Sequence, residues 1–280
     1  MLAQLEPFFP KAFKRYVEPF LGGGAVFFRQ ASVHSGLQAI LSDSNVELIN
    51  CYEGVRDRPD ELMRALDLHA VNFSKTGAAY YYAVRTKRIV PNPVERAARM
   101  IFLNKTCFNG LWRVNSRGEF NVPIGSALPK EYYVGRNIMA ASRALRRATL
   151  KAGDFEETLS QATDGDFVYV DPPYFPRSPT SSFTAYTAEI FGRTAQAKLA
   201  VCVAEAVLRG ATAVLSNSDT PLIRELYGDF DIHEVTSRRA INAVGTDRGR
   251  VPELVIVAKK KSKRGRKLPS TSDGPAPGVS

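Results

Sequence analysis

The sequence has few of the residues that build metal sites and disulfide frameworks. Its 280 residues include only three cysteines and three histidines. Cys51, Cys107 and Cys202 are widely scattered and match neither zinc-ligand spacing nor a disulfide pattern. We therefore expect reduced thiols and no bound metal.

Long apolar runs are also missing. No stretch approaches the ~20 apolar residues that a membrane span requires. Residues 1–7 lack the charged-then-apolar layout of a secretion signal. Hydrophobic content of 44% and charged content of 24% are ordinary for a globular protein. We expect a cytoplasmic protein with no membrane partner, either a monomer or a weak dimer.

Positive charge is abundant and unevenly distributed. The formal net charge is +10, and seven basic residues lie between Lys259 and Lys267. Residues 259–280 have the composition of a disordered tail. Residues 85–117 hold eight basic residues and a single acidic one, Glu95, before the next carboxylate at Glu119. A block of one sign favours a polyanionic partner such as nucleic acid.

A glycine turn near the N-terminus is typical of a nucleoside-binding site. The short apolar run Tyr16–Leu21 leads into Gly22, Gly23 and Gly24, and a helical pattern follows. Glycines permit close approach of a ligand, and a helix N-terminus offers unpaired N–H groups. A second apolar run ends in Asp43, at the distance expected for a carboxylate that binds ribose. These features fit a dinucleotide or S-adenosylmethionine equally well; a structural turn with a helix cap is the plainer interpretation.

The run Ala148–Ala152 predicts another strand, with Asp154 after it. Asp154 could meet the adenine of a cofactor or cap a helix. Further on, residues 197–208 have amphipathic helical spacing, and residues 211–217 form a buried strand pattern.

The stretch Asp166–Tyr174 has the residue types of a site that binds an exocyclic amine. Its apolar residues stop abruptly at Asp171, Pro172, Pro173 and Tyr174. The strand would place Asp171 at the carboxyl edge of a sheet, where α/β folds bind ligands. The carboxylate and the Pro172 carbonyl can each accept one hydrogen from an exocyclic amine, while Tyr174 stacks on the base. An ordinary strand end with an Asp-Pro turn is the alternative.

Between about residues 52 and 140 the strand-like runs give way to basic, helical patterns. Within this segment, residues 103–125 contain Asn-Gly and Arg-Gly pairs beside alternating residues, which predicts a hairpin. Arginine and asparagine can recognise bases, and phenylalanine or leucine can wedge into an opened base stack. A hairpin whose aromatic residues simply pack on the domain is the alternative.

Glycine loop, basic hairpin and Asp-Pro-Pro-Tyr follow one another in the order that resembles the Dam-type (D12 class) DNA N6-adenine methyltransferases. The resemblance extends over nearly the whole chain and includes residues 18–24, 104–125, 183–186 and 216–220. It implies a Rossmann-like methyltransferase sheet of residues 1–51 and 141–258. It also implies a helical plus β-hairpin DNA-recognition insertion of residues 52–140, with residues 259–280 as a basic tail.

The resemblance also implies roles for individual residues. The catalytic set would be Asp171, Pro172, Pro173 and Tyr174. S-adenosylmethionine would be surrounded by Glu18, Pro19, Phe20, Gly22, Gly23, Gly24, Asp43, Asp154, Phe155 and Asp171. Double-stranded DNA would contact Lys105, Phe108, Asn109, Leu111, Arg113, Asn115, Arg117, Pro123, Phe183 and Tyr186.

Members that methylate GATC carry an inserting aromatic residue at the position of Phe108, and the residue types here fit that target. The target adenine would be flipped out of the duplex, because its amine is otherwise out of reach.

One departure from the family concerns residues 1–15. Members usually carry an aromatic residue, paired glycines and lysines ahead of the first strand, and these are not found here. A DNA-binding relative without catalysis is therefore one alternative. Another is a methyltransferase that acts on cytosine N4, RNA adenine or a protein amide. A dinucleotide oxidoreductase would leave the hairpin and Asp-Pro-Pro-Tyr unused.

Overall fold

A seven-stranded mixed sheet forms the centre of the molecule, in the order β3-β2-β1-β4-β5-β7-β6. The computed structural model describes residues 2–87, 89–126, 131–177, 191–238 and 250–260. The parallel strands β1 to β5 are followed by β7, which is antiparallel to both β5 and β6. The strands are β1 Tyr16–Glu18, β2 Ala39–Asp43, β3 Ala148–Ala152, β4 Phe167–Val170, β5 Thr212–Ser218, β6 Asp231–Arg238 and β7 Arg250–Ala258. The mixed, mostly parallel α/β sheet predicted from the sequence is confirmed.

The central strands are buried on both faces, which explains their continuous apolar runs. Every residue of β1 and β4 is buried. Proline limits both strands, because it has no N–H group to extend a ladder. Pro19 follows Glu18, so the strand expected over Tyr16–Leu21 ends early, and Pro172 follows Asp171.

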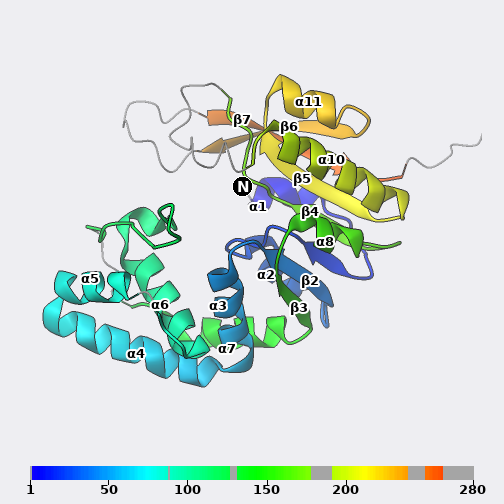
Figure 1. Ribbon diagram of the computed structural model, residues 1–280. Coiled ribbons are helices and arrows are strands. Elements are labelled where there is room, and N and C mark those ends of the chain that lie inside the picture. Colours follow the sequence, from blue (N-terminus) through cyan, green and yellow to red (C-terminus); the bar gives the residue numbers. More distant parts are fainter. Residues whose placement is uncertain (1, 88, 127–130, 178–190, 239–249, 261–280) are drawn as a thin grey trace, which may run out of the picture.

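Helices cover the two faces of the sheet over separate apolar cores (Figure 1). Neighbouring strand residues point to opposite sides, so Leu41 and Phe167 belong to one core and Ile40 and Val168 to the other. The first core is covered by α2 Ala25–Val33, α3 Val46–Asp57 and α7 Gly135–Leu145, and the second by α8 Phe155–Ser160, α10 Arg193–Leu208 and α11 Pro221–Leu226.

A helical lobe lies to one side of the sheet (Figure 1). It contains α4 Pro59–Thr76, α5 Ala78–Thr86, α6 Pro93–Thr106 and the 3₁₀ turn η2 Phe108–Gly110. Its own core packs around Tyr81 and Phe102. The expected domain boundaries at residues 51 and 140 fall inside α3 and α7. These two helices therefore join lobe and sheet without a linker.

The segment before β1 packs along the sheet. It contains α1 Leu2–Leu5 and the 3₁₀ turn η1 Glu6–Phe8. The rings of Phe9 and Phe13 each lie 5.3 Å from the ring of Phe167. These contacts place residues 2–15 over the first core.

The strand order reverses between β1 and β4. From β1 the chain continues outward through β2 and β3, whereas from β4 it continues the other way through β5. Such a switch point leaves a crevice at the carboxyl ends of the two strands, where open α/β sheets bind ligands.

Candidate functional site

A cavity of about 1080 Å³ opens at this switch point. It is bounded by the loops that follow β1, β2, β3 and β4 and by the first turn of α10. Its lining includes Pro19, Phe20, Gly22, Asp43, Ser44, Asp154, Phe155, Asp171, Pro172, Pro173, Tyr174, Phe191, Lys198 and Glu253. The structure thus brings together most of the residues that the sequence predicted for cofactor and catalysis.

The glycine loop is held by a carboxylate and a phenol. Asp43 accepts hydrogen bonds from the backbone N–H of Gly22 at 3.0 Å and of Asn45 at 2.9 Å. The Tyr52 hydroxyl donates to the carbonyl oxygen of Gly22 at 2.8 Å. Asp43 therefore fixes the loop and also lines the cavity.

The three glycines are not equivalent. Gly24 has a φ of 66°, and a Cβ there would lie 2.9 Å from the Tyr52 hydroxyl oxygen, so the chain itself requires this glycine. A Cβ on Gly22 or Gly23 would meet nothing within 4 Å. This open space beside a carboxylate and backbone N–H groups fits the nucleoside part of S-adenosylmethionine.

Aromatic rings form an apolar wall beside the glycine loop. Phe20 stacks on Phe155 at 5.5 Å, and Phe191 meets both rings edge-on or tilted at 5.6 and 5.8 Å. This wall suits a flat heterocycle. Phe191 had not been predicted, because it lies outside the recognisable motifs.

Asp154 serves as a helix cap as well as a cavity residue. It accepts a hydrogen bond from Glu156 N at 3.3 Å at the start of α8. Beside it, Lys198 of α10 forms an ion pair with Glu156. The helix cap expected as one interpretation is confirmed, and contact of Asp154 with a cofactor stays a prediction.

Asp171 occupies the far side of the cavity. Its Oδ1 accepts a 2.6 Å hydrogen bond from Ser216 Oγ of β5, and the carboxylate remains exposed to the cavity. Partial removal from water raises the pKa of this carboxyl, while the hydrogen bonds from Ser216 and Tyr174 lower it. Ser216 was not assigned a role from sequence, although it lies in β5, the strand next to β4.

Two further acids flank Asp171. Glu18 is buried, accepts a 2.8 Å hydrogen bond from Tyr16, and has a pKa raised well above its ordinary range by burial. The Tyr174 hydroxyl lies 3.5 Å from Glu253 Oε2, and burial raises the pKa of this phenol. Because an ionised Glu18 would repel Asp171, burial of Glu18 as the neutral acid is compatible with a charged Asp171.

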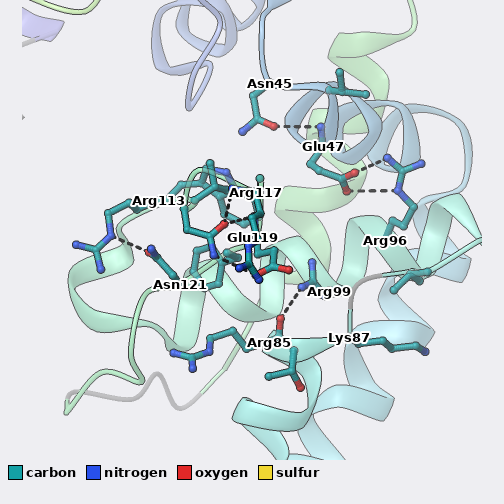
Figure 2. Close-up of a pocket in the computed structure, with 18 of the residues that line it drawn as sticks. Asn45, Glu47, Arg85, Lys87, Arg96, Arg99, Arg113, Arg117, Glu119 and Asn121 are labelled. Carbon is teal, nitrogen blue, oxygen red and sulfur yellow. Dashed lines mark hydrogen bonds and ion pairs between the residues drawn. The ribbon is translucent and has the colours of Figure 1, made fainter. Parts of the chain in front are cut away.

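A basic groove of about 1090 Å³ separates the helical lobe from the start of α3. Figure 2 shows arginines from α5, α6 and the hairpin facing this space. Arg96 is neutralised by an ion pair with Glu47. Ser44 lines both this groove and the cavity at the switch point. The two spaces are therefore adjacent. Their boundary is the loop after β2.

The hairpin predicted over residues 103–125 contains two isolated antiparallel bridges in place of extended strands. Cys107 pairs with Ile124, and Val114 pairs with Phe120. Asn109, with a φ of 54°, is the one non-glycine residue in the left-handed region among the described residues. Its turn is held by a 2.8 Å hydrogen bond from Asn104 Nδ2 to Gly110 O.

The predicted DNA-contacting residues fall into three groups. Arg113, Asn115 and Arg117 line the groove, but Asn115 Oδ1 also accepts from the backbone N–H groups of Arg117 and Glu119 at 3.0 Å. A second group lies outside that lining; its members are Lys105, Phe108, Asn109, Leu111 and Pro123, of which Phe108 is 46% and Leu111 40% exposed. Phe183 and Tyr186 are outside the described residues.

Within the part of the chain that the structure describes, no group of three or more His, Cys, Asp and Glu side chains is arranged to hold a metal ion. In the same residues, no helix combines the length and apolar character needed to cross a membrane. The cysteines at positions 51, 107 and 202 are free thiols.

This sheet, with its ligand cavity at the switch point, is that of a methyltransferase. The model of the D12 class N6 adenine-specific DNA methyltransferases matches residues 1–241, and the chain belongs to that family.

The chain is also similar to individual enzymes over most of its length. It is 39% identical to the type II methyltransferase M1.LlaDCHI of Lactococcus lactis subsp. cremoris, covering 91% of this chain and 90% of that protein. It is 37% identical to the type II methyltransferase M.MjaIII of Methanocaldococcus jannaschii, covering 92% and 94%. Identity to the DNA adenine methylase of Escherichia coli K12 is 35%, covering 87% and 86%. The protein is an adenine-specific DNA methyltransferase.

Proposed function

We propose that the enzyme methylates the N6 amino group of adenine in GATC within double-stranded DNA, with S-adenosylmethionine as the methyl donor and with the target base flipped into the cavity. The observation that carries this proposal is the contact between the two spaces at Ser44. A duplex held in the basic groove has the base-sized cavity directly beside it. The proposal includes a cytoplasmic location for this reaction.

Residues of the first half of the cavity would hold the cofactor. Asp43 would accept hydrogen bonds from the ribose hydroxyls, the open face of Gly22 and Gly23 would lie along the ligand, and Phe20 would pack on the adenine. When bound, S-adenosylmethionine supplies an electrophilic methyl group on a positively charged sulfur. The donor set therefore fits the cofactor by chemistry and by shape.

Residues of the second half would hold the target base. Oδ2 of Asp171 is not used by Ser216 and can accept one N6 hydrogen, while the Pro172 carbonyl accepts the other. Tyr174 would stack on the ring. These contacts would turn the nitrogen lone pair away from conjugation and toward the methyl group, which the cofactor would supply with its sulfur as the leaving group.

After transfer the nitrogen carries positive charge and must lose one hydrogen as a proton. The carboxylate of Asp171 would stabilise that charge and would accept the proton. Positioning of the two reactants supplies most of the acceleration in this scheme.

Recognition of GATC rests on the hairpin. Phe108 and Leu111, at the turn η2 near the base of the hairpin, are large apolar side chains that are 46% and 40% exposed, as a wedge into an opened base stack requires. Arg113 is oriented by a 2.7 Å hydrogen bond from its Nε to Asn121 Oδ1, which leaves its terminal nitrogens for a guanine edge or a phosphate.

The test is transfer of a labelled methyl group from S-adenosylmethionine to three matched duplexes that carry GATC, a scrambled site or premethylated GATC. We expect incorporation into unmodified GATC alone, at adenine N6. Equal labelling of the scrambled duplex would overturn the target assignment. Binding without transfer would support the noncatalytic alternative.

Asp171→Ala should abolish methylation, because the carboxylate is a direct acceptor for the reacting amine, and should leave duplex affinity within a few-fold. Transfer rate and gel-shift affinity measured on one preparation test this. Retained turnover would remove Asp171 from the mechanism.

A further inference from the structure

The catalytic loop Pro172–Phe175 is held from behind by two buried amide side chains. Gln196 of α10 and Asn217 of β5 are both 0% exposed, and neither lines the cavity. Each contacts the other and the loop. Asn217 falls within residues 216–220, which carry part of the family resemblance, but no role was assigned to it, and Gln196 lies outside the recognised stretches. Neither side chain touches substrate in the scheme above.

The directions of the hydrogen bonds form a fixed relay. Asn217 Nδ2 donates to Gln196 Oε1 at 3.1 Å, which requires the Gln196 Nε2 to face the loop. That nitrogen then donates to the carbonyl oxygen of Pro173 at 2.9 Å. The remaining oxygen of Asn217 accepts from the backbone N–H of Phe175 at 3.3 Å.

These hydrogen bonds replace backbone contacts that the loop cannot make. Pro172 and Pro173 have no N–H groups, so the loop cannot be held by a backbone ladder on that side. The contacts at Pro173 and Phe175 bracket Tyr174, and the contact at Pro173 is two residues from Asp171. The residues on either side of Tyr174 are therefore attached to α10 and β5.

We propose that Gln196 and Asn217 are positioning residues for methyl transfer, which hold the backbone of the catalytic loop so that Asp171, the Pro172 carbonyl and Tyr174 meet the target base together. The inference rests on the proposed catalytic role of that loop. It needs no particular target sequence, because any adenine duplex that the wild-type enzyme methylates can be used.

The experiment measures the single-turnover rate constant of the Gln196→Met variant at saturating duplex and cofactor. Methionine keeps the length and burial of the side chain but cannot donate to Pro173. We expect the rate constant to fall by roughly ten- to a hundredfold, since displacement by about 1 Å at a reacting centre has effects of this size. Dissociation constants for duplex and cofactor should stay within about threefold of the wild-type values, because neither residue lines the cavity or the groove.

Asn50→Leu is the matched control. Asn50 of α3 is also buried, and its Nδ2 donates to a proline carbonyl, that of Pro93, at 3.0 Å, but it lies away from the catalytic loop. This variant should lose thermal stability comparable to that of Gln196→Met while retaining its rate constant. A merely structural role for Gln196 would make the two variants alike.

Gln196→Asn keeps the amide but shortens its reach, and it serves if the methionine variant does not fold. The proposal is overturned if a folded variant at position 196 transfers methyl within threefold of the wild-type rate. The proposal is also overturned if Asn50→Leu lowers the rate constant as much as the variant at position 196 does. Failure of the wild-type enzyme to methylate any adenine duplex would instead count against the proposed function.

Discussion

Single side chains set the electrostatics of the cavity. Two opposing effects act on the pKa of the Asp171 carboxyl. Partial removal from water raises this pKa, and the hydrogen bond from the Ser216 hydroxyl lowers it. The carboxylate form is needed to accept the N6 hydrogen, so activity should fall as the pH drops through this pKa. The charge of Asp171 in turn adds to the raised pKa of Glu18, whose largest cause is burial.

Ser216→Ala should therefore shift the acid limb of the pH–rate profile to higher pH. Removal of the donor takes away a contact that favours the charged carboxylate, and loss of orientation should also lower kcat by about tenfold. The profile of kcat against pH provides the check. Ser142→Ala, which removes another buried serine whose Oγ donates to Arg56 O at 3.0 Å, should leave the profile unchanged. An unshifted limb in Ser216→Ala would contradict the assignment.

The glycine loop allows a second comparison at this scale. Gly23→Ala adds a methyl group to open space, so the melting temperature should change little while the cofactor dissociation constant rises about tenfold or more. Gly24→Ala should lower the melting temperature, because alanine is strained at a φ of 66° and its Cβ would lie 2.9 Å from the Tyr52 hydroxyl. Calorimetric titration and thermal melting distinguish the two. Unchanged cofactor affinity in Gly23→Ala would argue against a ligand beside this loop.

At the scale of elements, the start of β4 depends on an ion pair with the N-terminal segment. Asp166 is 3% exposed and accepts a 2.6 Å bond from Arg15 Nη2 and a 2.8 Å bond from Thr163 N. Arg15 also donates to Gln161 O at 2.7 Å. These contacts attach the chain before β1 to the turn before β4.

Asp166→Ala should lower the free energy of unfolding by about 3 kcal/mol, since a buried partner and its hydrogen bonds are left unmatched. Urea denaturation measures the change. The neighbouring pair Lys14–Asp164 joins the same segments but is 70% and 80% exposed, so Asp164→Ala should leave stability nearly unchanged. Equal losses in the two variants would show that burial is not the deciding factor.

The elements that could be predicted from sequence are those governed by local pattern. The runs Phe167–Val170 and Ala213–Leu215 are continuous and apolar because their strands are covered on both faces, and prolines mark where β1 and β4 stop. The hairpin was expected from its turn residues, but its ladder is reduced to two bridges. Strands β6 and β7, which alternate less clearly, had no distinct signal.

Contacts between distant segments could not be predicted in this way. Tyr52 reaches Gly22 across 30 positions, and Gln196 meets Pro173 across 23. These contacts form only when α3 and α10 pack on the sheet. No local pattern in the sequence indicates how those helices pack. The motif residues of the site were therefore recognisable, whereas the side chains that hold them were not.

For the whole molecule, charge distribution decides how DNA is approached. Seven basic residues lie between Lys259 and Lys267, mostly beyond the described residues. We predict that they add a sequence-independent attraction to phosphates, which counterion release would make salt-dependent. The basic groove, by contrast, has a defined geometry next to the cavity.

Truncation after Ala258 should weaken duplex binding and reduce the slope of log affinity against log salt concentration by up to about six. Preference for the target sequence should not change, because the hairpin is untouched. Binding titrations at several salt concentrations test this, with a full-length variant that carries glutamine at the seven basic positions as the control for charge. Altered sequence preference in the truncated protein would refute a purely electrostatic role.

The shared border at Ser44 has a consequence for inhibition. Cofactor analogues confined to the cavity resemble ligands of many methyltransferases and would discriminate poorly among them. A small molecule that fills the cavity and extends an acidic arm past Ser44 would enter the arginine-lined groove, which lies outside the proposed cofactor site. Such a compound would compete with cofactor and DNA at once, and its selectivity would come from the second arm.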